Sequence, residues 1–321
     1  MAYRQRLDMG FVMAAGALDL RPYREGDEEA ILRILNQKSE ARFSLDQWAW
    51  LVPIEADGRA IVVGERDNDV VAVCAGSPVR FAIDGGERAA LQLHGLASRD
   101  RCDLDRVLDF FVNTFGSINR FALATASFDF EGAAPTPVPA LIREGAGSVS
   151  PRRFLYRAEP ARDWEPRLDA LWERVRDSYP NAVVRNAELA LRRFAGRPSM
   201  KHHRFLVFPR YSCHAVAFAV FADDGSSCCW LDLIWDHGHP GALDLLAHIS
   251  GRLVAQWGSS GERLWLAGDD DASHLLVRRG FRPDASSPPV VSTRSFTPDL
   301  DAGDIVGRAY LTVADAGGLC P

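Results

Sequence analysis

The chain has 321 residues, of which 47% are hydrophobic and 25% are charged, and its formal net charge is −6 at pH 7. This length and composition are typical of a globular protein with two domains of about 150 residues each. The negative net charge argues against binding along the phosphate backbone of DNA. An uninterrupted apolar run of about 18 residues, the length that crosses a membrane, does not occur in the sequence.

The cysteines and the amino terminus bear on the cellular compartment. The six cysteines lack the CxxC spacing of zinc sites, and a disulfide framework belongs to small secreted domains. We therefore expect reduced thiols, no bound metal and a cytoplasmic protein. Residues 1–16 place Arg4 and Arg6 before an apolar run, but Asp8 and two glycines interrupt the pattern of an export signal. We interpret this segment as a disordered leader.

Apolar periodicity predicts strands and helices in both halves of the chain. In the first half the expected strands are 18–23, 60–83 (a hairpin with its turn at 65–69), 90–98 and 120–127, and the expected helices are 26–37, 103–116 and 139–145. In the second half the expected helices are 168–179, 242–258 and 271–280, and the expected strands are 204–236 (three antiparallel strands) and 263–268. The two halves therefore share a similar order of elements.

Three pairs of segments repeat this similarity in the letters themselves: 104–111 with 243–250, 120–127 with 263–270, and 141–147 with 276–282. Their similar spacing indicates an internal duplication. Segment 159–166, rich in proline and charge, is typical of a linker. We therefore predict an N-terminal domain at 17–158 and a C-terminal domain at 167–321.

The order of elements in each half resembles that of the GNAT superfamily of N-acyltransferases. Segment 228–246 resembles the strand, loop and helix that hold the pantetheine and diphosphate of acyl-CoA in that family, and segment 269–283 resembles its late helix. Segment 309–317 resembles the closing strand of tandem GNAT proteins from bacterial biosynthetic loci. The resemblance implies an α/β architecture of two tandem GNAT-like domains, each a mixed, mostly antiparallel sheet flanked by helices.

The resemblance also implies a site for acyl-CoA, such as acetyl-CoA, in the second half. The residues that match the donor-binding positions of the family are Leu233, Ile234, Gly238, Gly241, Ala242, Ala272 and Leu275. Diphosphate is held by backbone N–H groups at a helix start, which requires small residues and no adjacent negative charge. The matching loop of the first half, 99–104, lacks glycine and contains Asp100 and Asp103, so we expect that half to be a degenerate donor site.

Four residues of the second half are candidates for catalysis, because acyl transfer to an amine needs a base and donors for the oxyanion. Asp232 could be the base, or it could lie at a bulge or bond across the domain interface. Asp236, at the end of the same strand, could also take part in catalysis or could be the N-cap of the following segment. His237 and His239 could act as a base or contact the diphosphate, since the pKa of histidine lies near neutral pH.

The alternatives for the two histidines are a metal pair completed by His274 or Asp236, and an exposed turn; we expect no metal. Leu276 occupies the place of the usual tyrosine acid of the family, so the resemblance supplies no acid. In the first half, Gln92 and His94 lie on one face of a predicted strand. They could line an acceptor pocket between the domains or form a polar pair in the core.

Together these features predict an N-acyltransferase that moves an acetyl or similar group to the amine of a small molecule. The donor is acyl-CoA or the thioester of an acyl carrier protein, and a homodimer is compatible with the sequence. Two alternatives stay open. The chain could be a catalytically degenerate tandem GNAT protein that serves as a binding or scaffold component, or a GNAT-fold transferase that depends on aminoacyl-tRNA.

Overall fold

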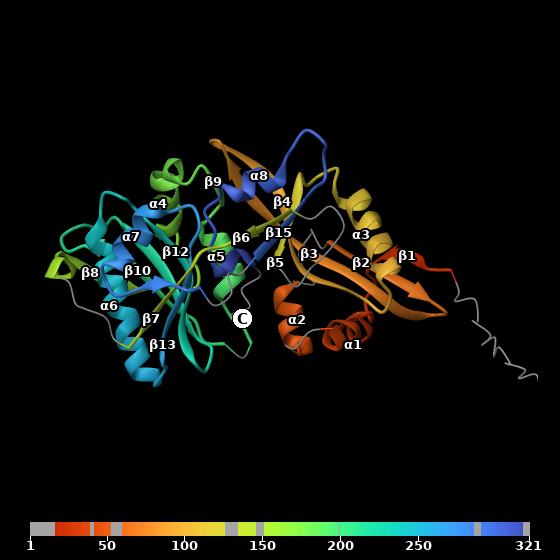
Figure 1. The fold of residues 1–321 in the computed structure, drawn as a ribbon, viewed down its shortest axis with the longest axis horizontal. Helices are drawn as coiled ribbons and strands as arrows, with labels where there is room; N and C mark the ends of the chain where they lie inside the picture. Colours follow the sequence, from red (N-terminus) through yellow and green to blue (C-terminus); the bar gives the residue numbers. More distant parts are fainter. Residues whose placement is uncertain are drawn as a thin grey trace, which may run out of the picture.

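The computed structural model describes residues 17–38, 42–52, 60–125, 134–145, 151–198, 200–285 and 290–316. The expected leader, 1–16, lies outside these residues. The described part of the chain forms an eight-stranded and a seven-stranded mixed sheet, which lie side by side with helices around them (Figure 1). The predicted class, two mixed α/β sheets flanked by helices, is therefore confirmed.

The first sheet has the strand order β1-β2-β3-β4-β5-β15-β6, and β9 also pairs with β3. Its strands are β1 (Asp19–Pro22), β2 (Ala60–Arg66), β3 (Asp69–Ile83), β4 (Gly86–Ser98), β5 (Phe121–Thr125), β6 (Ala134–Pro137), β9 (Asn181–Val183) and β15 (Val290–Ser295). The predicted β2–β3 hairpin turns at Asp67 and Asn68, which both have positive φ, as a tight primed turn requires.

The second sheet has the strand order β14-β7-β13-β12-β11-β10-β8. Its strands are β7 (Ala140–Glu144), β8 (Tyr156–Pro160), β10 (His203–Pro209), β11 (Ala217–Asp223), β12 (Ser227–Trp235), β13 (Gly261–Trp265) and β14 (Arg282–Pro283). The pair β4–β5 in the first sheet and the pair β12–β13 in the second run parallel.

The helices are α1 (Glu28–Lys38), α2 (Leu45–Leu51), α3 (Arg101–Phe115), α4 (Arg167–Val175), α5 (Ala187–Phe194), α6 (Pro240–Trp257), α7 (Asp270–Val277) and α8 (Ala302–Gly307), with 3-10 turns η1 (Pro151–Leu155), η2 (Arg176–Ser178) and η3 (Val313–Ala316). Alternate residues of β2 face opposite sides of the first sheet: Val62 packs in a core with α3, and Ile61 packs in a core with α1 and α2. Period-two alternation thus gives this sheet a helical layer on each face (Figure 1).

Two expectations about elements are wrong. Residues 139–145, expected as a helix, contain strand β7. The repeat that matched 141–147 with 276–282 therefore pairs a strand with the end of helix α7 and the turn after it. The apolar residues of β7, Ala140, Leu141 and Ile142, form a run too short for its period to distinguish a strand from a helix. The segment 309–317, expected as a closing strand, makes only isolated bridges at Tyr310 and Leu311 before η3. Strand β15 lies beside β5 instead.

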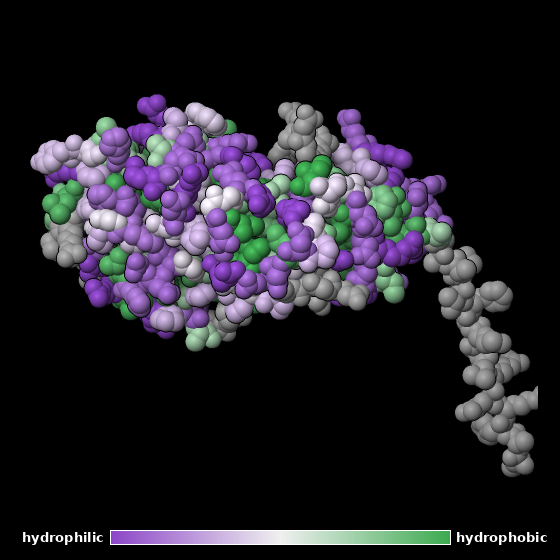
Figure 2. Space-filling model, turned by 90° about the horizontal axis from the view of Figure 1, so that it is seen from above, coloured by the Kyte–Doolittle hydropathy of each residue, from purple (hydrophilic) through white to green (hydrophobic). Residues whose placement is uncertain are grey.

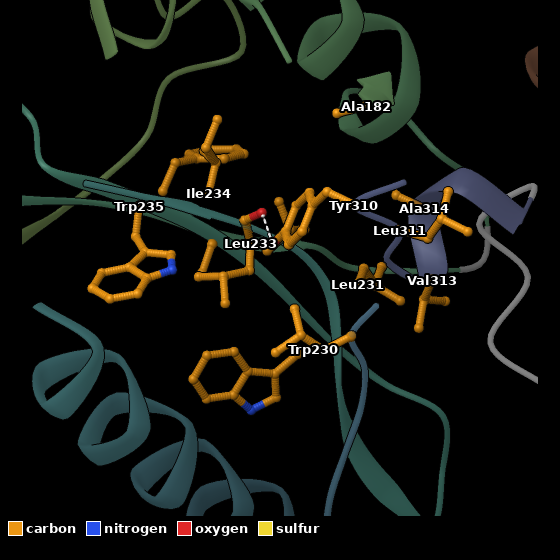
Figure 3. Packing of buried hydrophobic residues seen from close by; sticks show 14 of the residues in the cluster. Ala182, Trp230, Leu231, Leu233, Ile234, Trp235, Tyr310, Leu311, Val313 and Ala314 are labelled. Carbon is orange, nitrogen blue, oxygen red and sulfur yellow. Dashed lines mark hydrogen bonds between the residues drawn. The ribbon is translucent and has the colours of Figure 1, made fainter. Parts of the chain in front are cut away.

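The two sheets exchange strands along the chain. β7 precedes the expected linker but pairs with β13 of the second sheet, and β15 follows β13 but pairs in the first sheet. One hydrophobic core holds Phe81 and Phe121 of the first sheet together with Trp230 of the second. Figure 3 shows part of this core, where β12 packs against the segment that contains Tyr310. The sheets are therefore joined by strands and by a common core, and the domain boundaries stay a prediction.

The face seen in Figure 2 is mostly hydrophilic, with a hydrophobic patch near its middle. None of the described helices is long and apolar enough to cross a membrane. Cys74, Cys102, Cys213 and Cys228 are free thiols. Cys229 is disulfide-bonded, which corrects the expectation of a reduced thiol at that position.

Candidate functional site

In each sheet the parallel strands separate at a β-bulge. In the first sheet, β4 pairs with β5 at Leu91 and Gln92, and the bulge lies at His94. In the second sheet, the pairing of β12 with β13 ends at Trp230, and the bulge lies at Leu231. A bulge adds one residue to one strand and redirects the side chains around it. Beyond the bulge, β12 has an edge that β13 does not pair.

The backbone groups of this β12 edge are bound by side chains. The Tyr310 hydroxyl donates to the Leu233 carbonyl at 2.6 Å (Figure 3). The Tyr179 hydroxyl donates to the Trp235 carbonyl at 3.0 Å and accepts from its N–H at 3.2 Å. Burial raises the pKa of both tyrosines well above the ordinary value, so both hydroxyls stay protonated at neutral pH. Two tyrosine hydroxyls therefore take the place of a neighbouring strand.

Asp232 lies on β12 directly after the bulge and is buried. Its Oδ1 accepts from Arg185 Nε at 2.9 Å, from Thr312 Oγ1 at 3.0 Å and from the Leu233 N–H at 3.0 Å. The sequence left open whether Asp232 is a base or lies at a bulge or an interface. In the structure it follows a bulge and bonds to Arg185 and Thr312, which belong to other parts of the chain. Its role as a base stays a prediction.

The partners of Asp232 belong to a larger buried group, which we call the Asp315 network: Gln92, Arg185, Arg193, Asp232, Thr312 and Asp315. Asp315 accepts from Arg185, from Arg193 Nη1 at 3.0 Å and from the Thr312 N–H at 2.9 Å. Although burial opposes it, Arg185 and Arg193 lower the pKa of Asp315 below its ordinary value. The carboxylate is therefore ionised at neutral pH.

His237, Gly238 and His239 follow one another in the loop before α6, but the two histidine rings have different neighbours. The His237 ring lies 4.6 Å from that of Trp235 and 5.5 Å from that of Tyr179, with Nε2 3.5 Å from Asp269 Oδ2. His239 is the N-cap residue of α6, and its Nδ1 lies 3.3 Å from the Tyr156 hydroxyl.

Several amides of this loop are already bonded within it. The Gly238 N–H donates to Asp236 Oδ1 at 2.9 Å, the His239 N–H to the Asp236 carbonyl at 2.8 Å, and the Ala242 N–H to the His239 carbonyl at 2.9 Å. Pro240 has no N–H. Asp236 also accepts from Arg174 Nε at 3.3 Å. Asp236 thus stabilises the turn before α6, and the N-cap residue of that helix is His239 and not Asp236. A diphosphate would compete with these bonds.

The other predicted donor-binding residues surround this loop. Leu233 and Ile234 are fully buried on β12, and Gly241 and Ala242 are buried in the first turn of α6. Ala272 and Leu275 lie on α7; Ala272 is buried, and its N–H donates to Asp269 at 2.8 Å. Leu276, at the place of the usual tyrosine, is also buried.

A cavity of about 30 Å³ lies between the first sheet, α2, α5 and the carboxyl-terminal segment, and is lined by Trp50, Leu51, Ser77, Gln92, His94, Arg192, Arg193, Phe194 and Ala314. It has room for about two water molecules. The sequence predicted that Gln92 and His94 would share a face, and they line this cavity together. The predicted donor residues of β12 and α6 do not line it.

His94 is neutral in this cavity. Its Nε2 lies 2.5 Å from Ser77 Oγ, and its Nδ1 is buried without a hydrogen-bond partner among the described residues. Burial, followed by the charges of Arg192 and Arg193, lowers the pKa of His94 to about 3. The imidazole is therefore a hydrogen-bonding group at neutral pH and a poor base for an ammonium.

Sequence reasoning missed the arginines of α5 because it assigned no helix there. The signals for that helix are present: the Asn186 side chain accepts from the Leu189 N–H at 2.9 Å as an N-cap, and Leu189, Ala190 and Phe194 form a buried face. Tyr179 and Tyr310 were missed because nothing local marks them. Their contacts with β12 depend on tertiary structure.

Comparisons with known proteins find no matching family model and no matching curated protein. Solved structures do match. A GCN5-related N-acetyltransferase from Anabaena variabilis has a TM-score of 0.68 at 11% identity, covering 88% of this chain and 73% of that one. A GCN5-related N-acetyltransferase from Kribbella flavida has a TM-score of 0.67 at 14% identity, covering 94% of this chain and 82% of that one.

The N-myristoyltransferase of Saccharomyces cerevisiae, solved with bound myristoyl-CoA, has a TM-score of 0.61 at 12% identity, covering 91% of this chain and 88% of that one. Identities this low establish the fold and not the activity. The chain therefore has the fold of the GCN5-related N-acetyltransferases.

Proposed function

We propose that this chain is an N-acyltransferase that moves an acyl group from acyl-CoA to the amine of a small acceptor. The observation that carries the proposal is the separation of β12 from β13 beyond Trp230, with α6 beginning just after the end of β12. An extended, amide-bearing arm can add to a strand edge through main-chain hydrogen bonds. Its phosphates would then lie near the start of α6, where the helix dipole favours negative charge.

The residues at the start of α6 fit an anion in part. Gly238 is exposed, and because it has no side chain a ligand can approach its backbone closely. His237 and His239 precede and follow Gly238 in the chain, and their ring N–H groups can donate to phosphate oxygens. The Asp236 carboxylate opposes an anion, but its ion pair with Arg174 offsets part of that charge. These residues would hold the diphosphate.

A bound thioester supplies an electrophilic carbonyl and a thiolate leaving group. The acceptor nitrogen bonds to the carbonyl carbon as the C–S bond breaks, and the proton that the amine loses balances the one that the thiolate gains. We assign protonation of the sulfur to Tyr310. Its hydroxyl would release the Leu233 carbonyl and donate to the sulfur instead. Asp232, held by Arg185 and Thr312, we assign to positioning this segment.

A second candidate function is that of a binding component without catalysis. Two observations favour it: the tyrosine hydroxyls already occupy the β12 edge, and the Gly238, His239 and Ala242 amides are bonded within their own loop. A donor would have to displace some of these bonds. The two functions differ in whether the thioester is consumed when an amine is present.

The experiment is calorimetric titration of the protein with acetyl-CoA and with CoA, followed by an assay of amine-dependent thioester loss. Gly238→Glu places a negative charge at the start of α6, and Gly238→Gln is its neutral control of similar size. Micromolar binding that Glu abolishes and Gln retains supports the donor site. Binding without thioester loss across an amine panel supports the binding component. No binding contradicts a CoA donor and leaves an acyl carrier thioester to test.

A further inference from the structure

Strand β8 (Tyr156–Pro160) is an edge of the second sheet, and among the described strands only β10 pairs with it. The Ala161 N–H donates to the Arg204 carbonyl at 2.8 Å. Because hydrogen-bonded pairs alternate along an antiparallel ladder, the odd-numbered residues of β8 bond to β10, and the N–H and carbonyl of Ala158 face away from it. No described residue bonds to these two groups. An open edge of this kind is a template for a further strand.

The two side chains that flank Ala158 carry opposite charges. Arg157 and Glu159 bond to each other on one face of the sheet, and they are 38% and 39% exposed. If a second copy of β8 pairs antiparallel about a two-fold axis at Ala158, Arg157 of each copy lies directly opposite Glu159 of the other. Opposite charges at directly opposite positions stabilise a pair of strands. An axis at Arg157 or Glu159 would instead place that residue opposite its own copy, with the same charge.

Large apolar side chains are exposed at both ends of β8. Phe154 and Leu155 precede the strand, and Tyr211 follows β10 at the same end. Trp164 lies beyond the other end. These four make up half of the large exposed hydrophobic residues in the described part of the chain. Antiparallel pairing about a two-fold axis brings the first three, from one copy, to the end where Trp164 of the other copy lies. Aromatic side chains are enriched at such interfaces.

We propose that two copies of this chain form a homodimer by antiparallel pairing of β8 about a two-fold axis at Ala158, which joins their second sheets into one continuous sheet. Ala158 of each copy exchanges two backbone hydrogen bonds with its counterpart. Pro160 has no N–H, so it ends the pairing there. A second copy fits this edge because the order of charges and the apolar ends complement themselves. The dimer does not depend on the proposed acyl transfer.

The test is the oligomeric state in solution, measured by sedimentation velocity over a range of protein concentrations. We expect the wild-type protein to sediment as a dimer. Leu155→Asp places a charge among the exposed apolar side chains and should raise the Kd of the dimer roughly tenfold or more. Ile118→Asp, at an exposed apolar residue after α3, is the matched control and should leave the Kd unchanged. Ala158→Pro removes the outward N–H and keeps the bonds to β10, so it should weaken the dimer as Leu155→Asp does.

A charge reversal tests the register of the two strands. Arg157→Glu faces Glu159 of the other copy with a like charge and should weaken the dimer. Adding Glu159→Arg restores opposite charges across the axis and should recover the wild-type Kd. Arg167, which bonds to Glu159, keeps Glu165 as a partner in the double variant.

A wild-type chain that stays monomeric at about 100 μM, where a dimer with a Kd of about 10 μM would be mostly assembled, overturns the proposal. A dimer in which Leu155→Asp behaves like Ile118→Asp also overturns it, as does a charge reversal that weakens nothing or that the second substitution does not recover. Circular dichroism establishes that each variant is folded, and the exposed Leu155 position keeps the test decisive even where Ala158→Pro does not fold.

Discussion

Gln92 on β4 and Asp232 on β12 bind the same short segment of the chain. The Gln92 amide donates to the Ala314 carbonyl at 3.0 Å and the Asp315 carbonyl at 2.9 Å, and Asp232 accepts from Thr312 Oγ1 at 3.0 Å. Each strand is the one that separates from its parallel neighbour in its own sheet. The segment 312–315 therefore ties the two sheets together where both open, and it forms a wall between the β12 edge and the cavity.

Removing the Asp315 carboxylate should destabilise the protein strongly. Asp315→Ala leaves Arg185 and Arg193, both largely buried, with Asp232 as the one remaining carboxylate of the network. Breaking a buried ion pair from one side typically costs about 3–5 kcal/mol. We expect a loss of that size in the free energy of unfolding, measured in urea. Asp177→Ala, on an exposed side chain, is the control. A loss below about 1 kcal/mol would show that the network is not structural.

The parts of the site that the sequence predicted are those that local patterns mark, and the bonds of the Asp315 network are not among them. Period-two alternation placed Gln92 and His94 on one face, and the glycines and histidines of 237–241 marked the start of α6, because both are local patterns. The tertiary partners of Asp232, Arg185 and Thr312, leave no local trace. The exchange of β7 and β15 between the sheets was missed for the same reason: short apolar runs predict a strand and not its neighbours.

Replacing Arg192 should stabilise the protein. Arg192→Met keeps much of the side-chain length and eliminates a charge that burial disfavours. We expect the free energy of unfolding to rise by roughly 0.5–2 kcal/mol, the usual range for a single stabilising change. Arg252→Met, on an exposed helical position, should change it by less. A clear destabilisation by Arg192→Met would mean that Arg192 has a stabilising partner in the folded chain.

Tyr310→Phe should affect stability and, if the chain is a transferase, the rate. The ring keeps its contacts with Tyr179, 4.6 Å between centroids, and with Arg185. The Leu233 carbonyl loses its donor, which costs about 1–3 kcal/mol when a buried group is left unpaired. We expect kcat to fall with little change in KM for the donor. Tyr211→Phe, at a fully exposed position, is the control. Wild-type kcat in Tyr310→Phe would remove Tyr310 from the proposed chemistry.

The free energy of unfolding should fall as the pH decreases below the ordinary pKa of histidine. In that range His94 and His202 are protonated in the unfolded chain but stay neutral in the folded chain. Burial is the main cause that lowers the pKa of His94 to about 3 and that of His202 to about 4. In the unfolded chain both protonate near pH 6.5. Below that pH the unfolded state binds more protons, so the free energy of unfolding decreases by up to about 1.4 kcal/mol per pH unit for each histidine, and the effect ends near the folded pKa values.

The measurement for His94 compares wild type with His94→Gln by urea unfolding at pH 6.5, 5.5 and 4.5. Carboxylates titrate in both proteins, so the difference between the two pH slopes isolates His94, and we expect the variant to lose stability less steeply. NMR of the imidazole protons gives an independent reading, in which the His94 signal should not titrate above pH 5. A His94 midpoint near 6 would mean that the ring is solvated in the folded chain.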